Sequence, residues 1–328
     1  MTNKYLIDIE QFWSKYLAQY NYEYSEHTLN AIANNNDETA FLHLEDLVHC
    51  RERFGPNFTE LPKFKKLLNF ANGLMVVDKN RKKIMVENCT INPMIPQPYF
   101  GNPETADIVI LNKQPENDFR TDNPNIDGQR KIHLRNRILQ DFRGDLKFNG
   151  KKGFLPYEDE HIWFMKYFGG DSSILKQFNI NPNRLMILNY FPYQTTYQAG
   201  VPKDFLYTLA VLPSQQQNAD LFKMMFHDNK QRIYIVREEE LWGSFFSKAF
   251  TEEEKQLLLK NTFVYASKQN KYFTVGNILS YREQREKLKQ KRTLSKCEYY
   301  KWNQQLKEER LNGKSDFYKR MAALNNKY

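Results

Sequence analysis

The sequence predicts a mixed α/β protein, a three-layer α/β/α fold around a central, mainly parallel four-stranded sheet. Four short apolar runs alternate with stretches of helical periodicity, which is typical of parallel strands joined through helices. The runs are almost continuously apolar, as expected for strands covered on both faces. The strands are expected over 107–112, 184–189, 232–236 and 262–266. The helices between them are expected over 129–142, 161–168, 213–226 and 242–260.

The region before this pattern, residues 1–95, is predicted to be mainly helical because its apolar residues recur at helical spacing. Near its end, two short apolar runs at 73–78 and 83–87 flank the polar segment 79–82, which predicts a hairpin. Closely spaced prolines between 93 and 103 then indicate a stiff, extended linker. We therefore separate residues 1–95 from an α/β domain over 96–280.

The remaining segment, residues 281–328, is a basic helical tail. It holds 14 Lys/Arg and 6 Asp/Glu, so it carries +8 of the net charge of +9. Its pattern predicts one continuous helix over 280–299, a second piece over 301–310, and an interruption at Asn312-Gly313 before a last helix. A basic terminal segment favours a polyanion such as nucleic acid, or it is a solvated tail that keeps the protein soluble.

Composition sets limits on the class of protein. No apolar stretch approaches the roughly 20 residues of a membrane helix, and the start of the chain is acidic too early for a signal peptide. The three cysteines lack metal-ligand spacing, which favours thiols in a reducing compartment. An iron–sulfur cluster needs about four cysteines. We expect a cytoplasmic protein without a metal, a cofactor or a membrane partner.

In parallel sheets, ligands bind beyond the carboxyl ends of the strands, so the loops there are the candidate sites. The loop after the first strand contains Gln114 directly before a proline, then the carboxylates Glu116 and Asp118, and then Phe119. Either carboxylate can act as a general base, and the ring of Phe119 can stack on a planar base. The alternative is a plain polar turn in which Asp118 caps the next segment.

The second strand ends at Asn189, whose amide offers one acceptor and two donors. That is enough to read the hydrogen-bonding edge of a pyrimidine. The aromatic residues that follow, Tyr190, Phe191 and Tyr193, can form the walls of a pocket. The alternative is an asparagine that simply ends a strand before core aromatics.

The third and fourth strands also lead into polar segments. Arg237 follows the third strand, where it can contact a phosphate or pair with Glu239 or Glu240. The loop after the fourth strand has a polar, cationic rim suited to phosphate contacts: Ser267, Lys268, Gln269 and Asn270. An ordinary connecting loop is the alternative.

The strand order, the loop placement and these short matches resemble the uracil-DNA glycosylase superfamily over about 180 residues, 99–278. The resemblance implies that Gln114 takes the place that positions the attacking water, Asn189 the base-reading place, and Ser267 the serine of the loop that presses into the minor groove. Two departures stand out: Gln114 replaces the acidic residue of many members and cannot accept a proton, and the histidine that precedes the serine is absent.

By this resemblance we expect a DNA glycosylase that flips a damaged or modified base into a pocket and hydrolyses its N-glycosidic bond, in DNA repair or anti-phage defence. Its partners would be the phosphate backbone and the flipped base of DNA, and the protein would act as a monomer. Catalytic roles fall to Gln114 and Asp118, base contacts to Phe119, Asn189 and Tyr193, and DNA contacts to Arg237 and 267–270. One alternative is a catalytically inactive nucleic-acid-binding protein on the same fold. Another is a nucleic-acid-binding regulator that acts through the N-terminal helices and the basic tail.

Overall fold

The structure is a computed structural model of the 328-residue chain. It describes residues 9, 11–13, 15, 43–61, 74–77, 83–86, 98–113, 168, 170–181, 184–192, 212–237, 239–266 and 273–325. By its internal contacts the chain divides into two compact units. The first unit comprises Met1–Tyr99, Lys113–Asn149 and Asn189–Met224, and the second Phe100–Asn112, Gly150–Leu188 and Met225–Tyr328. The division of the sequence at 95 and 280 stays a prediction.

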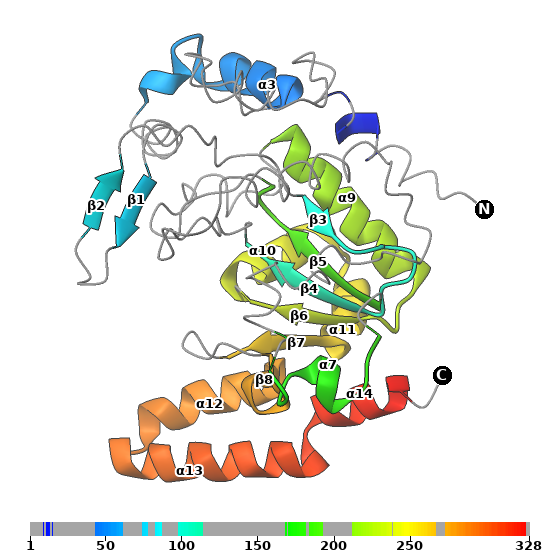
Figure 1. Ribbon diagram of the computed structural model, residues 1–328, viewed down its shortest axis with the longest axis vertical. Helices are drawn as coiled ribbons and strands as arrows, with labels where there is room; N and C mark the ends of the chain where they lie inside the picture. Colours follow the sequence, from blue (N-terminus) through cyan, green and yellow to red (C-terminus); the bar gives the residue numbers. More distant parts are fainter. Residues whose placement is uncertain are drawn as a thin grey trace. The chain divides into compact units, whose positions relative to one another are not determined.

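The first unit contains helix α3 (Leu44–Phe54), the short 3₁₀ helix η1 (Phe58–Glu60) and the hairpin strands β1 (Leu74–Val77) and β2 (Lys83–Val86). The two strands pair antiparallel, with Val77 opposite Lys83 (Figure 1). The hairpin expected from the sequence is therefore confirmed.

His43, at the start of α3, is fully buried and both of its ring nitrogens have partners. Its Nδ1 accepts the N–H of Glu45 at 3.1 Å, which places the ring proton on Nε2, 2.8 Å from the carbonyl oxygen of Phe12. The ring stacks on that of Phe12 at 3.9 Å between centroids, and Trp13 lies edge-on at 5.8 Å. The neutral ring thus ties α3 to the segment around Phe12.

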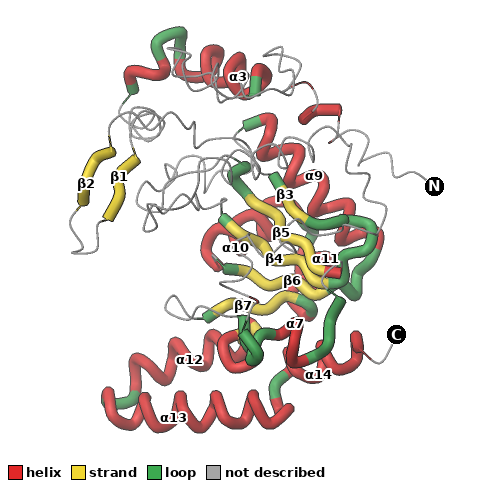
Figure 2. Tube along the Cα trace, in the orientation of Figure 1, coloured by secondary structure: helices red, strands yellow, loops and turns green. Residues whose placement is uncertain are grey.

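The second unit is built around a sheet with the strand order β3-β5-β4-β6-β7-β8 (Figure 2). The strands are β3 (Tyr99–Phe100), β4 (Ile108–Asn112), β5 (Leu185–Asn189), β6 (Ile233–Val236), β7 (Thr262–Tyr265) and β8 (Ile278–Ser280). Strands β4, β6 and β7 run parallel, and β8 is antiparallel to β7. The Asp107 N–H donates to the Arg184 carbonyl at 2.9 Å where β4 and β5 begin, so these two neighbours also run parallel (Figure 1).

The mixed α/β class and the mostly parallel sheet are as predicted, and β4 to β7 match the four predicted strands to within one residue. The prediction of four strands was wrong. Within the described residues, the sheet has five strands of three residues or more, together with the two-residue β3. Strand β8 has only three residues, between the 3₁₀ turn η4 (Val275–Asn277) and the next helix. It is too short to show a period in sequence.

Both faces of the central strands are buried. Every residue of β4, β5, β6 and β7 lies in the interior. On one face, alternate strand residues join a cluster with the short helix α7 (Ile174–Gln177) and with the last helix, α14 (Asp316–Asn325). The strand members of this cluster are Ile108, Ile110, Leu185, Ile187, Ile233, Ile235, Phe263, Tyr265 and, from β8, Ile278. This arrangement explains the near-continuous apolar runs of the sequence.

Among the described residues between β5 and β7, the helices are α9 (Pro213–Asp228), α10 (Glu239–Ala249) and α11 (Glu252–Lys260). Helix α9 agrees with the prediction, but the single helix expected over 242–260 is wrong. The helix is interrupted at Thr251, which is the N-cap of α11. The Thr251 side chain accepts the N–H of Glu254, and the Glu254 carboxylate accepts the N–H of Thr251. This capping box satisfies N–H groups that would otherwise lack partners at the start of α11.

The C-terminal region forms α12 (Tyr281–Thr293), α13 (Lys296–Glu309), the turn η5 (Arg310–Lys314) and α14. The continuous helix expected over 280–299 is wrong, because Ser295 and Glu298 form a second capping box that begins α13. The interruption predicted at Asn312-Gly313 is confirmed. Gly313 has a φ of 81°, a conformation that favours glycine.

We predict that Thr251→Ala lowers the free energy of unfolding by about 1 kcal/mol, because it removes the side-chain acceptor at the start of α11. Urea unfolding followed by circular dichroism measures the change. Ser247→Ala is the control, because Ser247 lies exposed within α10, where alanine is the better helix former. An unchanged stability of Thr251→Ala would show that the cap does not fix the break.

We also predict that the pKa of His43 lies below its ordinary value in the folded protein. Burial disfavours the charged ring and lowers the pKa of His43 below its ordinary value. Between that lowered pKa and about 6.5, the unfolded chain binds more protons than the folded chain. The stabilisation is therefore complete above about pH 6.5 and is lost as the pH falls below it. Ring-nitrogen chemical shifts measured by NMR across pH 5–7 report this directly, and an ordinary titration near 6.5 would contradict it.

A candidate ligand site at the carboxyl edge of the sheet

The strand order creates a point of reversal in the sheet. Strand β5 follows β4 along the chain and lies on one side of it, whereas β6 lies on the other side. The connections therefore change direction between β4 and β6. In open parallel sheets, ligands bind outside the carboxyl ends of the strands at such a point. The ends of β4 and β6 are the first place to look for a site.

Asn112 and Arg237 meet at this position. Asn112 is the last residue of β4 and is 5% exposed, and Arg237 directly follows β6. The Nη1 of Arg237 donates to the Oδ1 of Asn112 at 3.1 Å, and its backbone N–H donates to the carbonyl of Leu111 at 3.1 Å. Both contacts hold the arginine against the end of β4. Asn112 is a neutral amide, and its Oδ1 accepts from the guanidinium and orients it.

Asn189, at the end of β5, is fully buried and has its backbone fixed on both sides. Its N–H donates to the Pro98 carbonyl at 2.9 Å, and its carbonyl accepts the Nδ2 of Asn218 at 2.7 Å. Asn218 is a buried residue of α9. The helix thus sets the position at which the Asn189 side chain leaves the strand.

The segment that follows Asn189 is tied to Lys113, the residue after β4. The N–H of Phe191 donates to the carbonyl of Lys113 at 2.8 Å. Gln114 itself lies outside the described residues.

Most of the other predicted site residues lie outside the described residues, and their roles stay predictions: Gln114, Asp118, Phe119, Tyr193, Ser267, Lys268, Gln269 and Asn270. Of the predicted site, the structure therefore places Asn189 and Arg237. Sequence reasoning missed Asn112 and Asn218. Asn112 carries the same signal as Asn189, a polar amide that ends an apolar run. Asn218 is signalled only by its place among the apolar residues of α9.

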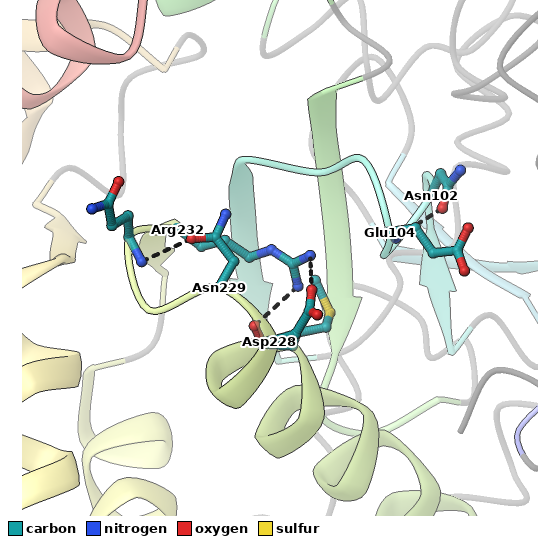
Figure 3. Close-up of polar contacts among 7 residues, drawn as sticks. Asn102, Glu104, Asp228, Asn229 and Arg232 are labelled. Atoms are coloured by element: carbon teal, nitrogen blue, oxygen red, sulfur yellow. Dashed lines mark hydrogen bonds and ion pairs between the residues drawn. The ribbon is translucent and has the colours of Figure 1, made fainter. Parts of the chain in front are cut away.

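The amino edge of the sheet has charged residues of a different kind (Figure 3). Arg232, 2% exposed, donates from Nη1 to the Met225 carbonyl at 3.1 Å and from Nη2 to the Asp228 carboxylate at 3.2 Å. Both acceptors belong to the last turn of α9, where a cation stabilises the helix end. Burial lowers the pKa of Arg232 from its ordinary value. These contacts give Arg232 a structural role.

Other polar contacts near this edge are also internal to the fold. Asp107, just before β4, forms an ion pair with Arg184, just before β5. In the turn that leads toward β4, the Oδ1 of Asn102 accepts the N–H of Glu104 at 2.9 Å (Figure 3). At the amino edge, the charged side chains of Arg232 and Arg184 therefore have structural partners within the fold. The candidate ligand site is the carboxyl edge.

Within the described part of the chain, no group of three or more His, Cys, Asp or Glu side chains is placed to hold a metal ion. None of the helices in that same part combines the length and the apolar character that crossing a membrane requires.

In comparisons with known proteins, no protein-family model, no curated protein and no solved structure matches the chain. What the fold and the placed residues define is a mixed α/β protein with a mostly parallel sheet, with buried asparagines at the ends of β4 and β5 and an arginine after β6.

We predict that Asn112 and Arg237 stabilise the fold as a pair. A double-mutant cycle with Asn112→Ala and Arg237→Met should give a coupling free energy of about 1–2 kcal/mol, because a hydrogen bond to a charged donor in a half-buried place is stronger than an average one. Urea unfolding measures it. The control cycle combines Asn261→Ala with Arg237→Met. Asn261 is a buried asparagine that follows α11 at the other edge of the sheet, so the two stability changes are expected to add. Additivity in both cycles would contradict the pairing.

Proposed function

We propose that this protein is a DNA glycosylase-like enzyme that hydrolyses the N-glycosidic bond of a damaged or modified base. The observation that supports the proposal most is the Asn112–Arg237 contact at the point of reversal of a mostly parallel sheet. It holds an arginine at the end of β4, where a ligand of a parallel sheet is expected. A three-layer, uracil-DNA glycosylase-like arrangement around this sheet is part of the proposal.

In this proposal a nucleotide leaves the base stack and its base enters a pocket next to Asn189. The buried Asn189 amide reads the hydrogen-bonding edge of the base, because an asparagine supplies one acceptor and two donors. Phe119 and Tyr193 would contact the faces of the base. The fixed backbone of Asn189 favours such a reading role, since recognition needs a side chain that is held before the ligand arrives.

The chemical step breaks the bond between the sugar C1′ and the base nitrogen, and the bonding electrons leave with the base. The sugar that remains is cation-like, and the Asp118 carboxylate and the DNA phosphates would stabilise it. Water held by Gln114 adds to C1′. Its proton passes to Asp118 or to solvent, because the Gln114 amide cannot accept one. Arg237 and residues 267–270 would hold the phosphates of the strand.

The departures from the superfamily shape the expected substrate. The place before the proline holds Gln114 and not an acid, and no histidine precedes Ser267. These changes point away from fast excision of uracil and toward a bulkier or hypermodified base, as in phage DNA. A role in repair or in anti-phage defence follows, with the protein acting as a monomer in the cytoplasm. The same departures favour the second candidate, a catalytically inactive protein that recognises DNA on this fold.

We predict that Asn189→Ala abolishes base release and leaves general DNA affinity within about twofold, because phosphate contacts supply most of that affinity. The purified protein would be incubated with uracil-containing oligonucleotides and with genomic DNA of phages that carry modified bases. Alkaline cleavage detects the abasic sites. Asn261→Ala is the control, since it also removes a buried amide but at the amino edge of the sheet.

Release that depends on Asn189 and survives in Asn261→Ala supports the glycosylase and identifies its class of substrate. Release that persists in Asn189→Ala overturns the assignment of this residue. If the wild type releases no base from any of these DNAs but binds them in a salt-sensitive way, the protein recognises DNA without catalysis.

A further inference from the structure

Helices α12 and α13 contribute no fully buried side chain to the core. Neither helix has a buried residue, whereas α14, which follows them, buries Phe317 and Met321. The two helices form a hairpin that runs out from β8 and returns to α14 (Figure 1). Each helix begins with its own capping box, Ser280 with Glu283 and Ser295 with Glu298. The start of each helix is therefore fixed by residues next to it in sequence. The hairpin therefore presents most of its length to solvent, where a partner can reach it.

One face of α12 carries a line of cations: Arg282, Arg285, Lys289 and Arg292. At 3.6 residues per turn, these positions fall within an arc of about 80° and extend over roughly 15 Å. All four side chains are exposed. Within the described part of the chain, none of them makes a hydrogen bond or an ion pair. We call these four residues the α12 basic stripe.

The acidic residues of α12 have partners of their own. Glu283 accepts the N–H of Ser280 at 2.6 Å in the capping box, and the Oε1 of Glu286 accepts the Nε2 of Gln290 at 2.6 Å. The stripe is therefore not neutralised by the carboxylates of its own helix, although Glu286 borders it. A row of four unpaired cations on an exposed helix face is complementary to a row of anions.

We propose that the α12 basic stripe binds the phosphate backbone of a nucleic acid, as a sequence-independent contact outside the base pocket. Regularly spaced phosphates match a straight row of arginine and lysine side chains. An anionic membrane fits less well, because a helix that lies on a membrane needs a broad apolar face. In α12 the large apolar residue that is exposed is Leu288. The choice of DNA as the nucleic acid rests on the proposed function.

The test compares two full-length variants that each remove four positive charges. The stripe variant is R282Q/R285Q/K289Q/R292Q. The control is K230Q/K260Q/K319Q/R320Q, whose residues are exposed in the second unit but lie outside α12 and α13. Fluorescence anisotropy measures binding to labelled duplex and single-stranded DNA from 50 to 200 mM salt. Circular dichroism checks that both variants fold.

In the stripe variant we expect the slope of log K against log salt to fall by about 3–4, since each phosphate contact contributes about 0.7–0.9. Affinity at 50 mM salt should fall by at least about tenfold, and the control should lose clearly less. Equal losses in the two variants would overturn the proposal, because net charge alone would then explain binding. So would loss of binding to phosphatidylserine vesicles without loss of binding to DNA.

The two proposals fail in different ways. If no base is released but the stripe variant still loses DNA affinity selectively, the glycosylase proposal is wrong and the proposal for the α12 basic stripe stands. If base release depends on Asn189 but the stripe variant binds DNA like the control, the stripe proposal is wrong and the glycosylase proposal stands.

Discussion

The burial of the sheet on both faces is the constraint on which the rest of this structure depends. Strands β4 to β7 leave no side chain on a solvated face, and one of their faces is closed by α7 and α14. Polar groups can therefore appear only where the strands begin or end. This requirement produces the apolar runs of the sequence, the asparagines that end β4 and β5, and the arginines that flank β6.

The two edges of the sheet use their polar residues differently. At the amino edge, Arg232 donates to the last turn of α9, and Arg184 forms an ion pair with Asp107. At the carboxyl edge, Arg237 contacts a neutral amide, and the strand order reverses beside it. Parallel sheets commonly place binding and catalysis at the second kind of edge. The basic hairpin α12–α13 adds a cationic surface that the core does not require.

The sequence predicts the central strands well because burial on both faces leaves a signal in every residue of a strand. It fails where the determinant is short or distant. Strand β8 has three residues, and the helix breaks at Thr251 and Ser295 depend on capping boxes that sequence reading could have used but did not. Asn189 could be selected from its place at a strand end. The contact of Asn112 with Arg237 could not, because the two residues are 125 positions apart and meet only through the strand order.

The central claim is that the carboxyl edge of the sheet is where this protein meets its ligand. Hydrogen–deuterium exchange with and without duplex DNA tests this claim most directly. The account predicts protection of the segments that follow Asn112, Asn189 and Val236, with no change around Asn102–Glu104 or Arg232 at the opposite edge. Protection confined to the amino edge, or to the α3 segment of the first unit, would contradict it.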